Sequence, residues 1–163
     1  MQFTNDQAPR FETTVRVRWS EGDRQGIAFN GSYLEYLEIA QSEYFRNLGY
    51  SIYTLGESGF FDTVIVNTQL TFVIPVKVDE IITLRARVTA LGTTSMNFEV
   101  AIFNQSNKLT TTITAVYVGY NQATERKMNI PDDIRRLITE FENTGMVLPL
   151  SSLPELNKHL DDR

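Results

Sequence analysis

The 163-residue sequence contains no cysteine and only one histidine. Without cysteine the chain has no disulfide, no thiolate metal site and no cysteine nucleophile. The single histidine, His159, is in the last five residues, where chains are usually poorly ordered, so we expect a solvated tail histidine. This excludes Ser-His and Cys-His machinery and a histidine-rich metal site, and we expect no metal and no cofactor. Any chemistry must then depend on carboxylates, hydroxyls, amides and backbone groups.

Positive charge and long apolar runs are also scarce. Fifteen Lys+Arg residues against twenty Asp+Glu residues give a formal net charge of -5. This balance favours neither nucleic acid nor an anionic membrane surface as a partner. Residues 1–12 are polar and lack the apolar stretch of a signal peptide, and no run is long enough to span a membrane. We therefore expect a cytoplasmic protein.

The strongest local pattern is a helix between a strand and a series of further strands. Residues 11–20 alternate apolar and polar side chains, as a half-buried strand does. Ser32 and Glu35 predict a capping box at the start of a helix that ends before Gly49. The apolar stripe at helical spacing consists of Tyr33, Tyr36, Leu37, Ala40 and Tyr44.

The remainder is strand-like up to about residue 121, after a loop that contains Gly56 and Gly59. Strands are expected over 62–74 and 80–91, over a segment from Met96 to Ile102, and over 109–120. A short helix is expected over 134–141, and the tail from residue 143 onward is expected to be an appendage that the fold does not need. This order predicts an α+β fold with one long helix against an antiparallel sheet.

The last strand carries apolar residues on both faces, with Ile113, Ala115 and Tyr117 on one face and Val116 and Val118 on the other. Both faces of the sheet should therefore be covered. One helix cannot cover both, so we expect a second subunit, in a homodimer or homotetramer.

Four segments resemble the hotdog-fold thioesterases of the 4-hydroxybenzoyl-CoA thioesterase type. They are the Asp-containing loop and helix start over 17–33, the helix over 34–46, the strand-Pro-turn-Asp segment over 71–81 and the exit from the last strand over 123–131. The resemblance covers about residues 11–141. It implies an antiparallel sheet wrapped around one long central helix, in a single domain (1–163) with a core of about 11–142 and a tail of 143–163. It also implies hydrolysis of an acyl thioester of coenzyme A, or of acyl carrier protein, to the free acid.

The resemblance also assigns roles to residues of this chain. Asp23 is the expected catalytic carboxylate, the Asn30 backbone N–H polarises the thioester carbonyl, and Gly26 permits the tight loop that aims Asp23. Expected substrate-binding residues are Phe29, Gly31, Tyr33 and Arg126. Other candidates for CoA phosphates are Arg85, Arg87 and Lys127.

Two further carboxylates are not expected to be catalytic. Glu38 lies on the helix, where some hotdog thioesterases carry their catalytic acid, but we expect a structural or interface role. Glu21 is expected to be a solvated loop charge.

Departures from the family pattern concern the neighbours of the catalytic loop. The family often has Thr where this chain has Gly22, a Tyr-His pair where it has Phe29-Asn30, and Gly where it has Val78. Asp23 can attack the carbonyl or deprotonate water, and the sequence does not choose. The resemblance implies that hotdog dehydratases and hydratases use a histidine, and because no histidine is expected in the core of this chain, these activities are disfavoured. A non-catalytic module that binds acyl-CoA or acyl carrier protein is the alternative function.

Overall fold

The computed structural model describes residues 8–161; residues 1–7 of the polar N-terminal segment and residues 162–163 lie outside the described residues. The strands are β1 (Phe11–Arg16), β2 (Thr63–Phe72), β3 (Ile81–Leu91), β4 (Ser95–Phe103), β5 (Leu109–Asn121) and β6 (Arg126–Lys127). The α-helices are α1 (Ser32–Asn47), α2 (Ile52–Glu57), α3 (Asp132–Thr144) and α4 (Pro154–Asp161), and short 3-10 turns occupy Trp19–Glu21 and Leu150–Ser152. No helix within 8–161 is long and apolar enough to cross a membrane.

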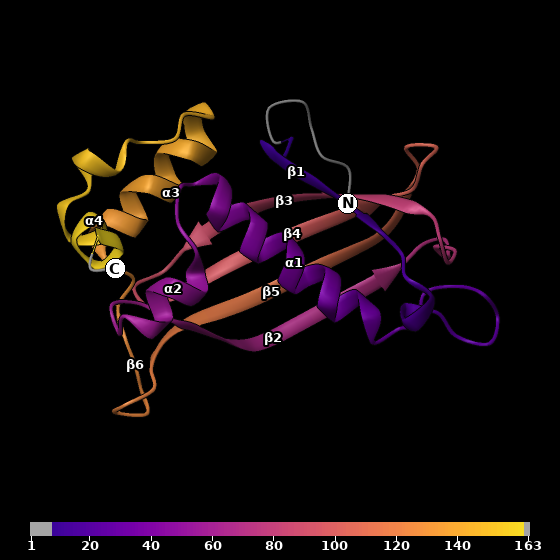
Figure 1. Cartoon of the computed structure of the whole chain (residues 1–163), viewed down its shortest axis with the longest axis horizontal. Coiled ribbons are helices and arrows are strands. Elements are labelled where there is room, and N and C mark those ends of the chain that lie inside the picture. Colours follow the sequence, from indigo (N-terminus) through magenta and orange to yellow (C-terminus); the bar gives the residue numbers. More distant parts are fainter. Residues whose placement is uncertain (1–7, 162–163) are drawn as a thin grey trace.

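The strands form one antiparallel sheet in the order β1-β3-β4-β5-β2, with β6 paired to the end of β5. Figure 1 shows α1 lying across one face of this curved sheet, roughly along the strands. In β3 every second residue from Ile82 to Val88 is buried, and in β4 every second residue from Met96 to Ile102 is buried, as the alternation in the sequence predicts. The alternation breaks at Ala90, which is exposed after a bulge between Val88 and Ala90, and Ala101 on the opposite face of β4 is also buried. The predicted α+β fold, with an antiparallel sheet wrapped around one long helix, is confirmed.

The core is built around the aromatic side chains of α1. The predicted stripe is buried, and Tyr36, Leu37, Ala40 and Tyr44 have no exposed surface. The Tyr44 ring makes edge contacts with four other rings at centroid distances of 5.4–5.8 Å, namely those of Phe11, Phe45, Phe98 and Phe141. Because these partners come from β1, α1, β4 and α3, one side chain joins the helix to both the sheet and the C-terminal part of the chain.

The predicted capping box at the start of α1 is wrong. The N-cap is Gly31, and no side chain caps the helix. Ser32 lies inside the first turn, and its hydroxyl donates a hydrogen bond to the Glu21 carbonyl oxygen at 3.0 Å. The Ser32 hydroxyl therefore bonds to a carbonyl eleven residues earlier in the chain and does not form the helix cap that the local spacing predicted.

The outer face of the sheet is more polar than expected. Arg87 pairs with Glu99 at 2.8 Å, and Arg85 pairs with Glu12 at 3.0 Å and lies over the Phe103 ring. The expectation that these arginines contact CoA phosphates is therefore not supported by their positions, because both are engaged on this face. On β5 the Val116 side chain is half-buried and Val118 is buried, and the expected second subunit stays a prediction.

Apolar surface is instead exposed on the edge strand β2. Val64, Ile65 and Val66 are 38%, 49% and 57% exposed, and Phe72 and Val73 at its end are also exposed. One long edge of β2 pairs with β5, and within residues 8–161 no strand pairs with the other.

The C-terminal tail is packed against the core rather than appended to it. Leu153 and Leu156 are fully buried, and the Asp133 carboxylate accepts hydrogen bonds from the backbone N–H groups of Glu155 and Leu156 at 2.8 and 3.1 Å. These bonds satisfy donors in the first turn of α4. Figure 1 shows α3 and α4 together at one end of the sheet.

Two local expectations are corrected in the same region. His159 is not a solvated tail residue: it lies on α4, is half-buried, and stacks on the Phe60 ring at a centroid distance of 4.5 Å. The stretch before Gly59 that was expected to be a loop contains α2, whose first turn is capped by Ser51.

Candidate functional site

The loop that carries Asp23, residues 22–28, is held in shape by backbone hydrogen bonds. The Asp23 N–H donates to the Ile27 carbonyl at 2.9 Å, and the Gly26 N–H donates to the Asp23 carbonyl at 3.0 Å. Residues 26–28 also pair with Val76 and Val78, which anchors the loop to the segment after β2. Gly26 has φ +73°, a left-handed conformation that glycine adopts without strain, as the predicted tight turn requires.

The Asp23 carboxylate is exposed at the tip of this loop. Its Oδ1 accepts a hydrogen bond from the Gln25 N–H at 2.7 Å, a local turn that fixes the side chain. Within residues 8–161 no ion pair engages Asp23, and no donor contacts its Oδ2. One carboxylate oxygen is thus held while the other is open to a substrate or a water molecule.

Gly22 and Val78, the two positions in and beside the Asp23 loop that depart from the family pattern, have complementary side-chain sizes. A Cβ atom placed on Gly22 would collide with the Val78 side chain. Where the family has a side chain at the first position and glycine at the second, this chain has the reverse. The two residues share one space, so the loop keeps its approach to the turn before β3.

The helix N-terminus beside the loop presents free donors. The Phe29 N–H donates to the Glu21 carbonyl and the Ser32 N–H donates to the Phe29 carbonyl, whereas in the described part of the chain the N–H groups of Asn30 and Gly31 have no acceptor. Such groups, together with the helix dipole, stabilise a negative oxygen placed near them. This is the position expected of the Asn30 N–H.

Glu21 is buried and structural, which corrects the expectation of a solvated charge. It is only 4% exposed, and its carboxylate accepts hydrogen bonds from the Arg18 N–H at 2.8 Å and from the Tyr36 hydroxyl at 2.9 Å. Burial and the neighbouring Glu21 raise the pKa of Tyr36. Glu21 therefore ties the loop to the middle of α1, and no local sequence signal indicated this.

The other expected substrate-binding residues are only partly brought together. Phe29 is 58% exposed and lies against Gly31, where a Cβ would come within 2.8 Å of its ring. Tyr33 is buried, with its ring edge against Tyr36 and Phe72, so its side chain belongs to the core. Burial also raises the pKa of Tyr33.

Arg126 lies far from Asp23 in the same chain. It pairs with Asn121 at one end of β5, whereas the Asp23 loop lies near Phe72, which pairs with Thr111 at the other end. These positions are separated by ten residues of strand, about 30 Å. Figure 1 shows β6 and the indigo loop before α1 at opposite ends of the sheet.

A groove that the sequence did not indicate runs between α1 and β2, and we call it the α1–β2 groove. Its volume is about 520 Å³. It is lined by Leu34, Glu35, Glu38, Gln41, Ile52, Tyr53, Asp62, Thr63, Ile65, Thr68 and Tyr117. Its lining comes from four separate parts of the chain, so no motif spacing reveals it.

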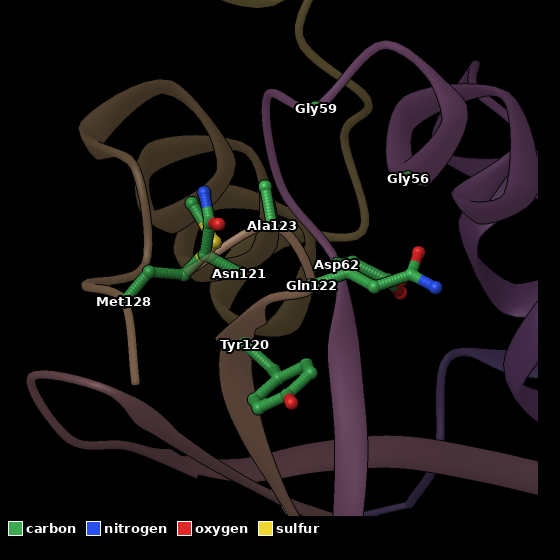
Figure 2. Close-up of a pocket in the computed structure, with 8 residues that line it drawn as sticks. All are labelled: Gly56, Gly59, Asp62, Tyr120, Asn121, Gln122, Ala123 and Met128. Carbon is green, nitrogen blue, oxygen red and sulfur yellow. The ribbon is translucent and has the colours of Figure 1, made fainter. Parts of the chain in front are cut away.

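A second, smaller pocket has a volume of about 280 Å³ (Figure 2). It is lined by Gly56, Gly59, Asp62, Tyr120, Asn121, Gln122, Ala123 and Met128. Asp62 lines both spaces. In residues 8–161 no cluster of histidine, aspartate and glutamate side chains is arranged to hold a metal ion.

Comparison with known proteins identifies relatives with this fold. The sequence matches the family model of the thioesterase superfamily over residues 25–111, a match that begins two residues after Asp23. The acyl-CoA thioesterase YbgC of Haemophilus influenzae is 24% identical over 112 residues, which cover 67% of this chain and 82% of that protein.

Solved structures agree with this match. DHNA-CoA thioesterase from Staphylococcus aureus aligns with a TM-score of 0.75 and 19% identity over 84% of this chain and 95% of that chain. Slr0204, a 1,4-dihydroxy-2-naphthoyl-CoA thioesterase from Synechocystis, aligns with a TM-score of 0.72 and 14% identity over 85% of this chain and 98% of that chain. The fold is the hotdog fold.

Proposed function

Because this chain belongs to the thioesterase superfamily, we propose that it hydrolyses acyl-CoA thioesters to the free acid and coenzyme A, with Asp23 as the working carboxylate. The observation that carries the proposal is the exposed, partly fixed Asp23 carboxylate in the loop that leads to the free N–H groups of Asn30 and Gly31. A carboxylate and an oxyanion-stabilising helix end are the two groups that thioester hydrolysis without histidine requires.

In the proposed reaction the thioester carbonyl oxygen lies at the Asn30 N–H, where the helix end stabilises the charge that develops on it. Asp23 Oδ2 then acts in one of two ways. As a nucleophile it displaces the CoA thiolate to form a mixed anhydride, which water hydrolyses. As a general base it takes a proton from water, whose oxygen attacks the carbonyl carbon. In both routes the C–S bond breaks and the thiolate leaves with a proton from water.

The proposal includes a second subunit that pairs along β2. Antiparallel pairing of two β2 edges places the Thr63 end of one strand beside the Phe72 end of the other. The Thr63 end adjoins β6 and the Phe72 end adjoins the Asp23 loop. Arg126 of the partner subunit would then lie on the side of the molecule where Asp23 is exposed, as a substrate-binding cation. Phe29 and Gly31 complete the expected substrate surface within one subunit.

The test is Asp23→Asn, assayed for turnover of an acyl-CoA panel. We expect turnover to fall by about 10²- to 10⁴-fold if Asp23 is a general base, and further if it is a nucleophile. The melting temperature should stay nearly unchanged, because the carboxylate is exposed. Asp132→Asn, an exposed aspartate at the start of α3, is the matched control and should retain normal turnover.

Two results would overturn the proposal. If Asp23→Asn hydrolyses thioesters normally while Glu38→Gln does not, the acid on α1 is the catalyst. If the wild-type protein binds acyl-CoA or acyl carrier protein thioesters tightly and hydrolyses none, the protein is a binding module.

A further inference from the structure

Within residues 8–161, three carboxylates and no cationic side chain line the α1–β2 groove. Glu35, Glu38 and Asp62 lie along it, and none of the described residues that line it is a lysine, arginine or histidine. The Glu38 carboxylate accepts a hydrogen bond from the Tyr53 hydroxyl at 2.7 Å, and Asp62 Oδ1 accepts one from the Thr63 N–H at 2.7 Å. Each of these carboxylates keeps acceptor capacity for a ligand.

A buried hydroxyl in the same groove lacks a partner. Tyr117 is 3% exposed, and in residues 8–161 no group forms a hydrogen bond with its hydroxyl. Tyr117 lines the groove together with Glu38 and Tyr53, which already pair with each other. Burial raises the pKa of the Tyr117 hydroxyl, and the nearby Glu38 raises it further. A buried polar group is rarely left unsatisfied. Of the three such hydroxyls in residues 8–161, those of Tyr50, Thr111 and Tyr117, the Tyr117 hydroxyl is the one in the lining of this groove, where a polar ligand atom can complete it.

The groove begins one turn from the proposed reaction centre. Leu34 and Glu35 lie in the first turn of α1, directly after Asn30 and Gly31. With a rise of about 1.5 Å per residue, Glu35 lies about 6 Å and Glu38 about 10 Å along the axis from Gly31. A chain of six atoms, equivalent to two extended residues, spans about 7 Å. Helical side chains tilt towards the helix N-terminus, which brings the Glu38 carboxylate closer to Gly31 than its backbone is. The distal end of a medium-length acyl group therefore reaches Glu35 and the Glu38 carboxylate.

We propose that the α1–β2 groove receives the distal end of the acyl group and selects acyl chains that end in a hydrogen-bond donor. A chain that ends in a protonated amine is preferred to one that ends in a hydroxyl. An ammonium group donates three hydrogen bonds and its positive charge is attracted by the carboxylates, whereas a hydroxyl donates one hydrogen bond and carries no charge. A distal carboxylate is rejected, because it would lie unpaired among like charges. This inference rests on the proposed function, whose reaction centre sets the start of the acyl chain.

The experiment compares four CoA thioesters that share a five-methylene chain and differ only at its distal end. Heptanoyl-CoA ends in a methyl group, 6-hydroxyhexanoyl-CoA in a hydroxyl, 6-aminohexanoyl-CoA in an ammonium group and pimeloyl-CoA in a carboxylate. We expect kcat/KM to fall in the order ammonium, hydroxyl, methyl, carboxylate, with about a tenfold or larger range, as a single charge-assisted contact provides.

Two variants assign the selectivity to residues. Glu38→Gln should reduce the preference for the ammonium over the carboxylate substrate by about three- to tenfold. Tyr117→Phe should reduce the preference for the ammonium and hydroxyl substrates over heptanoyl-CoA without lowering the melting temperature. The matched controls are Glu43→Gln, on the same helix outside the groove, and Tyr50→Phe, another buried tyrosine with an unpartnered hydroxyl. Both should preserve the order.

Equal kcat/KM for the four thioesters, or equal shifts in the variants and their controls, would overturn the inference. A changed sedimentation coefficient in Glu38→Gln and Tyr117→Phe, without a changed substrate order, would also overturn it and make the groove a contact between subunits. If no thioester is hydrolysed, the proposed function fails, and the dissociation constants of the same four compounds then decide the inference. The same order in affinity supports it, and equal affinities reject it.

Discussion

Two carboxylates in this protein differ in exposure and in hydrogen bonding, and these surroundings determine what each can do. Asp23 is exposed and has one free oxygen, whereas Glu142 is half-buried on α3. The Glu142 carboxylate accepts hydrogen bonds from the Tyr44 hydroxyl at 2.6 Å and from the Val88 N–H at 2.8 Å. Burial raises the pKa of Glu142 above its ordinary value of 4.5, although these two hydrogen bonds and the nearby Arg87 and Arg10 lower it.

The raised pKa predicts a pH-dependent stability. A carboxyl group with a higher pKa in the folded state binds its proton more tightly when folded. The contribution of Glu142 to the free energy of unfolding is therefore full below about pH 4.5 and falls as the pH rises through the folded pKa. Urea unfolding of wild type and Glu142→Gln between pH 4 and 8 should show wild-type stability, relative to the variant, decreasing across that window.

The matched control for this experiment is Asp132→Asn, an exposed carboxylate at the start of the same helix. Its stability relative to wild type should vary less with pH. A constant difference between wild type and Glu142→Gln would show that burial does not shift this group.

At the scale of elements, the C-terminal helix α4 is part of the core. Leu153 and Leu156 contribute fully buried side chains, and Asp133 on α3 caps the first turn of α4. The half-buried His159 adds a stacked contact with Phe60, which follows α2. The tail therefore joins α3 to the segment between α1 and β2, and its loss would expose apolar surface on both.

We expect a chain that ends at Asn143 to be strongly destabilised, because it loses these side chains and the partner of Asp133. The single substitution Leu153→Ala should lower the free energy of unfolding by about 2–5 kcal/mol, as truncation of a buried leucine does. Val147→Ala, at an exposed tail position, should have little effect. Thermal and urea unfolding measure both, and unchanged stability of the shortened chain would restore the view of the tail as an appendage.

At the scale of the whole molecule, the edge of β2 is the surface that requires a partner. Residues 63–73 contain no charged side chain, and the strand exposes Val64 and Val66 beside its unpaired backbone. Edge strands that stay unpaired are usually protected by charge, proline or a covering segment. A β-bulge between Ile65 and Asn67 is the one irregularity of this strand within the described residues.

Sedimentation should therefore show a dimer or a larger oligomer. Val66→Lys should shift the protein towards the monomer, because a charged side chain at this exposed position of the edge strand opposes association. Turnover should fall as the dimer dissociates if Arg126 acts across the subunit boundary. Val147→Lys, an exposed valine in the tail, is the control and should not change the oligomeric state. A stable, fully active monomer would contradict both the pairing and the shared site.

The local pattern of the sequence was sufficient for the long strands, α1 and α3 and for their order, but it did not indicate α2, β6 or α4. Alternation in 80–91 and the stripe from Tyr33 to Tyr44 record which side of each element faces the core, so the strands, α1 and the α+β class were predicted. Asp23, Gly26 and the Asn30 N–H were found because they are close in the chain and follow a family pattern. The structure brings these three into one loop and the helix that follows it, and their catalytic roles remain predictions.

Only the tertiary structure decided which distant residues meet. Glu21 and Tyr36, Gly22 and Val78, and Asp133 and Leu156 are partners that no local period records. Ser32 donates to the Glu21 carbonyl and does not cap α1, and the tail packs against the core. Both differ from the expectation because hydrogen bonds and burial with distant partners outweigh weak local preferences. The α1–β2 groove exists for the same reason. A sequence specifies which faces are apolar, but a cavity is the space that remains after those faces have packed.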